Sequence, residues 1–123
     1  MGQEIFDLKL KGYCCSQIIM QMGLARMEKV NEDLVAAMAG LCDGLWQGKV
    51  CGTLSAAICL LYLADPYESG KAHARDMYEW FEDAFGAVDC DDILEGKPLM
   101  KTQKCPMIVE SAFTKIMELL EWD

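Results

Sequence analysis

Residues 50–64, VCGTLSAAICLLYLA, constrain the fold of this chain most, because they are apolar on nearly every helical face. A helix that is apolar all round in a water-soluble protein has to be surrounded by other elements. We therefore expect a central helix over residues 50–64, enclosed by the rest of the chain. The stretch is shorter than the ~20 apolar residues that span a bilayer, so no membrane insertion is expected.

The remaining segments carry apolar residues at helical spacing, and none alternates as a half-buried strand does. We expect helices over residues 2–11, 13–27 and 69–85, with a short helical turn after Asp89. Asn31 is the expected N-cap of a further helix, and Pro106 the expected first residue of the last one. The predicted fold class is all-α, a compact bundle of five to six helices in a single domain, residues 1–123.

The charge of the chain argues against some classes of partner. Acidic residues outnumber basic ones by 20 to 11, which gives a formal net charge of −9. Such a field repels phosphate backbones, so no nucleic-acid partner is expected. The first residues, MGQEIFDLKL, lack the basic and then apolar pattern of a secretion signal. A cytoplasmic location is the corresponding prediction.

The chain has seven cysteines, and none of them forms a C-x-x-C pair. Four of them share a position at an expected helix start: Cys15, Cys51, Cys90 and Cys105. The free N–H groups and the dipole of a helix N-terminus favour the thiolate, the form that binds metals and attacks disulfides. Gly52 would let a cofactor or another backbone approach Cys51 closely. These four thiols are the predicted site.

The other chemically active residues have simpler explanations. Cys42 and Cys59 are expected to be small core residues, because free cysteine is often buried. A disulfide between the neighbours Cys14 and Cys15 is disfavoured, because adjacent helical side chains diverge. The roles of Cys14 and Cys42 stay open. His73, the only histidine, is expected to be a surface residue rather than a ligand.

Four segments resemble, in order, the elements of the C_GCAxxG_C_C family, whose members are described as redox-active. They are YCCSQII with Cys15, CGTLSA with Cys51, FGAVDCDDIL with Cys90 and KCPMIVE with Cys105. The resemblance extends through nearly the whole chain. It implies a redox role through these four cysteines and a possible link to a transporter system.

The first functional prediction is an iron–sulfur cluster for electron transfer, bound by Cys15, Cys51, Cys90 and Cys105. One alternative is cofactor-free thiol–disulfide exchange, in which Cys51 attacks and Cys15 or Cys105 resolves the mixed disulfide. The other alternative is an interaction module whose fold is stabilised by a structural zinc ion. If the protein is an enzyme, it is expected to be an oxidoreductase with a redox partner protein. Aromatic residues available for a homodimer are Tyr13, Trp46 and Trp122.

Overall fold

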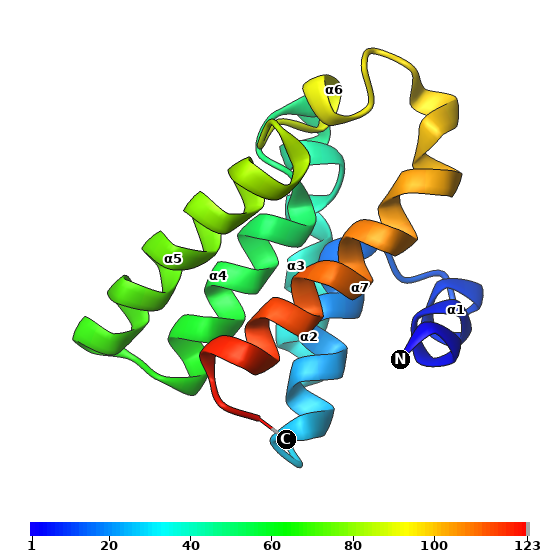
Figure 1. Cartoon of the computed structure of the whole chain (residues 1–123). Coiled ribbons are helices and arrows are strands. Elements are labelled where there is room, and N and C mark those ends of the chain that lie inside the picture. The colour runs from blue at the N-terminus through cyan, green and yellow to red at the C-terminus, as the bar shows by residue number, and fades with distance from the viewer. Residues whose placement is uncertain (123) are drawn as a thin grey trace.

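Helix α4 (Gly52–Ala64) runs through the middle of the computed structural model, which describes residues 1–122 (Figure 1). It packs against α2 (Cys15–Arg26), α5 (Tyr67–Phe85) and α7 (Lys101–Leu119). Side chains along most of its length are buried, including Leu54, Leu60 and Leu61. The predicted central helix is confirmed.

Shorter helices complete the bundle around these four. Helix α1 (Gly2–Leu10) lies against α7 and α2, and α3 (Glu32–Met38) lies against α2. Helix α6 (Cys90–Ile93) has only four residues and lies near the start of α4 (Figure 1). Further short turns span Ala39–Leu41, Gly44–Gly48 and Pro98–Met100. Residues 1–122 thus form seven α-helices and no strands, which confirms the all-α class and exceeds the expected five to six helices.

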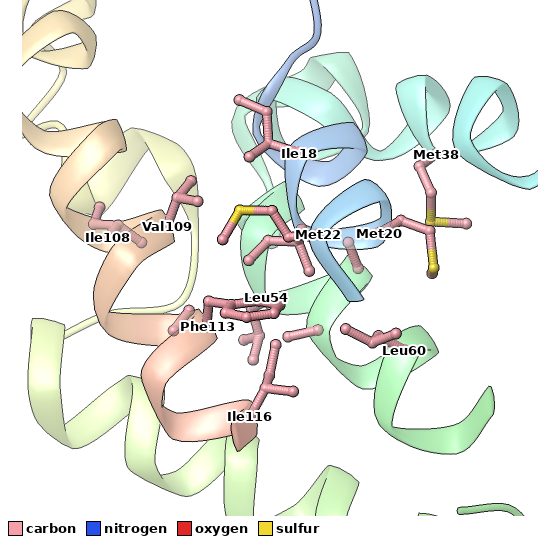
Figure 2. Close-up of a cluster of buried hydrophobic side chains, with 14 of the residues drawn as sticks. Ile18, Met20, Met22, Met38, Leu54, Leu60, Ile108, Val109, Phe113 and Ile116 are labelled. Carbon is pink, nitrogen blue, oxygen red and sulfur yellow. The ribbon is translucent and has the colours of Figure 1, made fainter. Parts of the chain in front are cut away.

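The core is built from methionine and aliphatic side chains of α2 and α4 that meet α7 (Figure 2). Met20 and Met22 of α2 and Phe113 of α7 are almost completely buried. Helices α2 and α4 approach closely where Gly23 faces Leu60, because a Cβ at Gly23 would overlap the Leu60 side chain. The close packing of α2 on the central helix therefore depends on a glycine opposite a leucine.

The last helix starts earlier than expected. Pro98, rather than Pro106, stands at the first position of a helical turn, and α7 follows directly from Lys101. Pro106 therefore lies inside α7, where it has no N–H to bond to the Thr102 carbonyl. The prediction that Cys105 marks a helix start is wrong, because α7 continues through this proline.

The N-terminus of α3 tests the N-cap that the sequence predicts at Asn31. The Asn31 Oδ1 atom accepts a hydrogen bond from the backbone N–H of Leu34 at 3.0 Å, which confirms the predicted N-cap. Asn31→Ala is expected to lower the free energy of unfolding by about 1 kcal/mol, measured by urea denaturation. Asn31→Asp keeps the acceptor and should cost much less. An equal loss in the two variants would contradict a capping role.

Among residues 1–122 no helix combines the length and apolarity needed to cross a membrane.

Candidate functional site

Two backbone segments hold Cys51 and Cys90 together at the start of α4. The Cys51 N–H donates to the Val88 carbonyl at 2.7 Å, and the Cys90 N–H donates to the Lys49 carbonyl at 2.8 Å. These bonds form an isolated antiparallel bridge between Val50 and Asp89. Cys51 is the N-cap of α4 and Cys90 the first residue of α6. Because the bridge fixes both backbones, the two thiols lie close enough for each to shift the pKa of the other.

The contact between the two thiols leaves Cys51 as the thiolate. The hydrogen bond from Cys90 lowers the pKa of Cys51 from 9.0 to about 7, although burial opposes ionisation. Backbone N–H groups of Leu54 and Thr53, together with the Thr53 hydroxyl, also lower it. The same hydrogen bond raises the pKa of Cys90. The pair therefore holds one proton between two sulfurs near neutral pH.

Cys15 lies beside this pair at the first residue of α2. A Cβ added to Gly52 would lie 3.2 Å from the Cys15 sulfur and 2.6 Å from the Leu41 carbonyl oxygen. The glycine thus lets the start of α4 approach Cys15 and Leu41 closely. Burial, followed by the charge of Cys51, raises the pKa of Cys15 to about 11. Cys15 is consequently a protonated thiol.

Cys105 reaches the same region from α7. It lines a cavity of about 50 Å³ together with Cys14 and Cys15, and Lys9 of α1 lies on the cavity wall. Burial and then the charge of Cys51 raise the pKa of Cys105. The four predicted cysteines therefore gather around the start of α4, three of them at helix starts and Cys105 within a helix.

A disulfide joins Cys14 to Cys42, with their Cα atoms 6.3 Å apart. Cys42 is not an incidental core cysteine as expected, although its burial at 2% exposure is confirmed. The hydroxyl of the buried Ser16 donates to the Met38 carbonyl at 2.7 Å and contacts the Cys42 sulfur. The sequence signal that could have indicated this disulfide is the position of each cysteine relative to its helix. Cys14 precedes α2 and Cys42 follows α3, so an antiparallel pairing of these helices brings the two cysteines to one end.

Two residues outside this cluster lie elsewhere on the surface. Cys59 is exposed, so its expected place in the core is wrong. The His73 Nε2 atom lies 3.1 Å from Asp65 Oδ2, just beyond the C-terminal end of α4. His73 is thus at the opposite end of α4 from Cys51, in agreement with its predicted absence from the site.

A left-handed turn forms one wall of the site. Asp43, Gly44, Leu45 and Trp46 all have φ between 52° and 61°. Each non-glycine residue in this conformation costs roughly 1–2 kcal/mol. The turn is held by an ion pair between Asp43 and Lys101 and by the Trp46 indole N–H, which donates to the Ala39 carbonyl at 2.9 Å. Strained backbone of this kind often accompanies a functional site.

The turn opens onto a cavity of about 210 Å³ beside the thiol pair. Cys90 lies on its wall, together with Trp46, Asp91, Lys97 and Lys101. Cys90 is half-buried, whereas Cys51 is only 6% exposed. A reactant that enters this cavity therefore meets the Cys90 sulfur first.

A metal site requires several ligand side chains that surround one point. Within the part of the chain that the structure describes, no three or more Cys, His, Asp and Glu side chains form a group that could hold a metal ion. Four thiols have the right donor chemistry for iron–sulfur or zinc ligation. In the described residues these four thiols do not come together as such a ligand group.

The helical fold and the clustered cysteines define a small all-α thiol protein. The chain belongs to the C_GCAxxG_C_C family, described as "Putative redox-active protein", whose model matches residues 13–119. The family name writes the central element as G-C-A-x-x-G, so Cys51 stands at its cysteine, Gly52 at its alanine, and Val50 and Ser55 at its glycines. That element begins one residue before the segment CGTLSA. No curated protein and no solved structure matches the chain.

Proposed function

We propose that the protein carries out thiol–disulfide exchange with Cys51 and Cys90 as its two-electron redox pair. The observation that carries this proposal is the backbone bridge that holds Cys51 and Cys90 side by side. A thiolate with a thiol beside it is the arrangement that attacks a disulfide and then releases the product. The redox character of the family supports the same reaction class.

The geometry favours Cys90 as the attacking sulfur, because it faces the cavity and Cys51 is buried. Cys90 transfers its proton to the Cys51 thiolate along their hydrogen bond and attacks a partner disulfide, R–S–S–R′. A Cys90–S–R bond forms and R′–S⁻ leaves. Cys51 then gives the proton to R′–S⁻, attacks the Cys90 sulfur and releases R–S⁻. The pair becomes a disulfide and the partner is reduced by two electrons.

This role for Cys90 differs from the sequence-based alternative, in which Cys51 attacks and Cys15 or Cys105 resolves. The Cys90 thiol already contacts Cys51, so it needs no rearrangement to complete the disulfide. Proximity of this kind strongly accelerates an intramolecular step.

The pH dependence of the reaction tests the pair. With a pKa of about 7, roughly half of the pairs carry the thiolate at pH 7, against about 1% for a thiol with the ordinary value of 9.0. The rate with 4,4′-dithiodipyridine should therefore be low below pH 6, rise through pH 7 and level off above pH 8. In Cys90→Ala the pKa of Cys51 loses its main lowering influence, so the midpoint for any remaining reaction should move upward.

Cys59→Ala is the matched control, because it removes the exposed thiol outside the cluster and should lose only the reaction of that thiol at high pH, while the rise through pH 7 is kept. The wild-type rate is followed by stopped-flow absorbance of the released thiopyridone under anaerobic conditions. A wild-type profile that rises only near pH 9 would contradict the proposed pair.

The iron–sulfur cluster and the zinc site stay predictions from the sequence. Cys15, Cys51, Cys90 and Cys105 would have to converge more closely to hold such a group, so we assign no step to it. Iron, sulfide and zinc analysis of anaerobically purified protein distinguishes these alternatives from the thiol pair. The redox partner protein, the transporter link and a homodimer are likewise still predictions.

A further inference from the structure

The Cys14–Cys42 disulfide lies next to the free thiols rather than apart from them. Cys14 shares the 50 Å³ cavity between α1, α2 and α7 with Cys15 and Cys105. On the other side, the Cα atom of Cys42 lies 3.2 Å from the position of a Cβ on Gly52, the residue that follows Cys51. The disulfide therefore adjoins the cavity that Cys105 lines on one side and the start of α4, next to Cys51, on the other.

We propose that Cys14–Cys42 is a second redox couple, and that Cys105 carries a disulfide to it from the Cys51–Cys90 pair. This inference rests on the proposed function, because the disulfide has to form first between Cys51 and Cys90. Its product is the state seen in the structure, with Cys14 and Cys42 joined and Cys51, Cys90 and Cys105 free.

Cys105 suits the carrier role better than Cys15. Cys15 is the sequence neighbour of Cys14, and side chains of adjacent residues point apart. Cys105 comes from a different helix and lines the same cavity as Cys14, where the charge of Lys9 partly offsets the burial that raises the pKa of Cys105. The missing backbone hydrogen bond at Pro106 loosens the turn of α7 that carries Cys105. That turn can therefore adjust toward either pair.

The transfer takes three exchanges, each of which replaces one S–S bond by another. The Cys105 thiolate attacks the Cys51 sulfur of Cys51–S–S–Cys90 and releases the Cys90 thiolate. The Cys14 thiolate attacks Cys105 and releases the Cys51 thiolate. The Cys42 thiolate then attacks Cys14 and releases the Cys105 thiolate. Two protons pass overall from Cys14 and Cys42 to Cys51 and Cys90, so no outside oxidant is consumed.

The test begins with fully reduced protein, which is mixed anaerobically with one molar equivalent of 4,4′-dithiodipyridine. Samples are quenched with acid over time, alkylated with N-ethylmaleimide, digested without reduction and mapped by mass spectrometry. We expect a Cys51–Cys90 disulfide to form first and to decay as Cys14–Cys42 appears. In Cys105→Ser the first disulfide should form and then persist.

Two matched variants sharpen this result. Cys59→Ser and Cys15→Ser should transfer the disulfide as the wild type does, with circular dichroism used to check that each variant is folded. Transfer at the wild-type rate in Cys105→Ser would overturn the role of Cys105. A stable Cys51–Cys90 disulfide in the wild type would overturn the second couple and leave the proposed function intact. If Cys51–Cys90 never forms, the proposed function itself fails.

Discussion

Cys51→Ser is expected to abolish the reversible two-electron oxidation of the thiol pair. Serine keeps the size of the side chain but supplies no thiolate, so Cys90 loses both its proton acceptor and its resolving partner. Cys90 would then stop at the mixed disulfide with a small-molecule reactant. Peptide mass mapping after incubation with 4,4′-dithiodipyridine should show a thiopyridyl group retained on Cys90, in addition to that on the exposed Cys59.

The comparison with Cys59→Ser separates this effect from a general loss of thiols. Cys59 is also in α4 but is exposed and lies outside the cluster, so its loss should leave formation of the Cys51–Cys90 disulfide intact. Formation of an internal disulfide to Cys90 in Cys51→Ser, at the wild-type rate, would show that another cysteine resolves the reaction. That result would contradict the proposed pair.

Leu60→Ala is expected to cause a large loss of stability. Leu60 is completely buried and fills the space that Gly23 leaves on α2. Truncation of a buried leucine removes apolar contact and leaves a cavity, which costs about 2–5 kcal/mol. The free energy of unfolding measured by urea denaturation should fall by this amount.

Leu63 supplies a control of the same type in the same helix. Its side chain is 43% exposed, so Leu63→Ala should change the free energy of unfolding by much less.

A second test uses Gly23, the glycine of α2 that faces Leu60. Gly23→Ala alone should destabilise the protein by overpacking, and in combination with Leu60→Ala it should recover part of the loss. Strictly additive losses would contradict direct packing of these two positions.

The sequence could predict the features that depend on local pattern. The apolar stretch at residues 50–64 and the N-cap at Asn31 follow from burial and capping, which are decided within one or two helical turns. The helix starts at Cys15, Cys51 and Cys90 follow for the same reason. The all-α class could be predicted because no segment shows the two-residue period of a strand.

The features that the sequence missed depend on how helices meet. Cys14 and Cys42 pair only because α2 and α3 lie side by side, which the spacing of the two cysteines does not show. Cys59 lies in a largely apolar stretch, and Ser55 and Tyr62, which share its helical face, were only a weak signal that this face meets solvent. The contact of Cys51 with Cys90 comes from two backbone hydrogen bonds between distant loops, and these leave no residue pattern.

The Cys14–Cys42 disulfide also closes a loop, because it links residues 28 apart around α2 and α3. A crosslink of this span removes conformational freedom from the unfolded chain equivalent to about 3–4 kcal/mol. That amount is a large part of the total stability of a small protein. Fully reduced chains should therefore be the first to unfold and to be digested by proteases. The lifetime of the polypeptide would then follow its oxidation state.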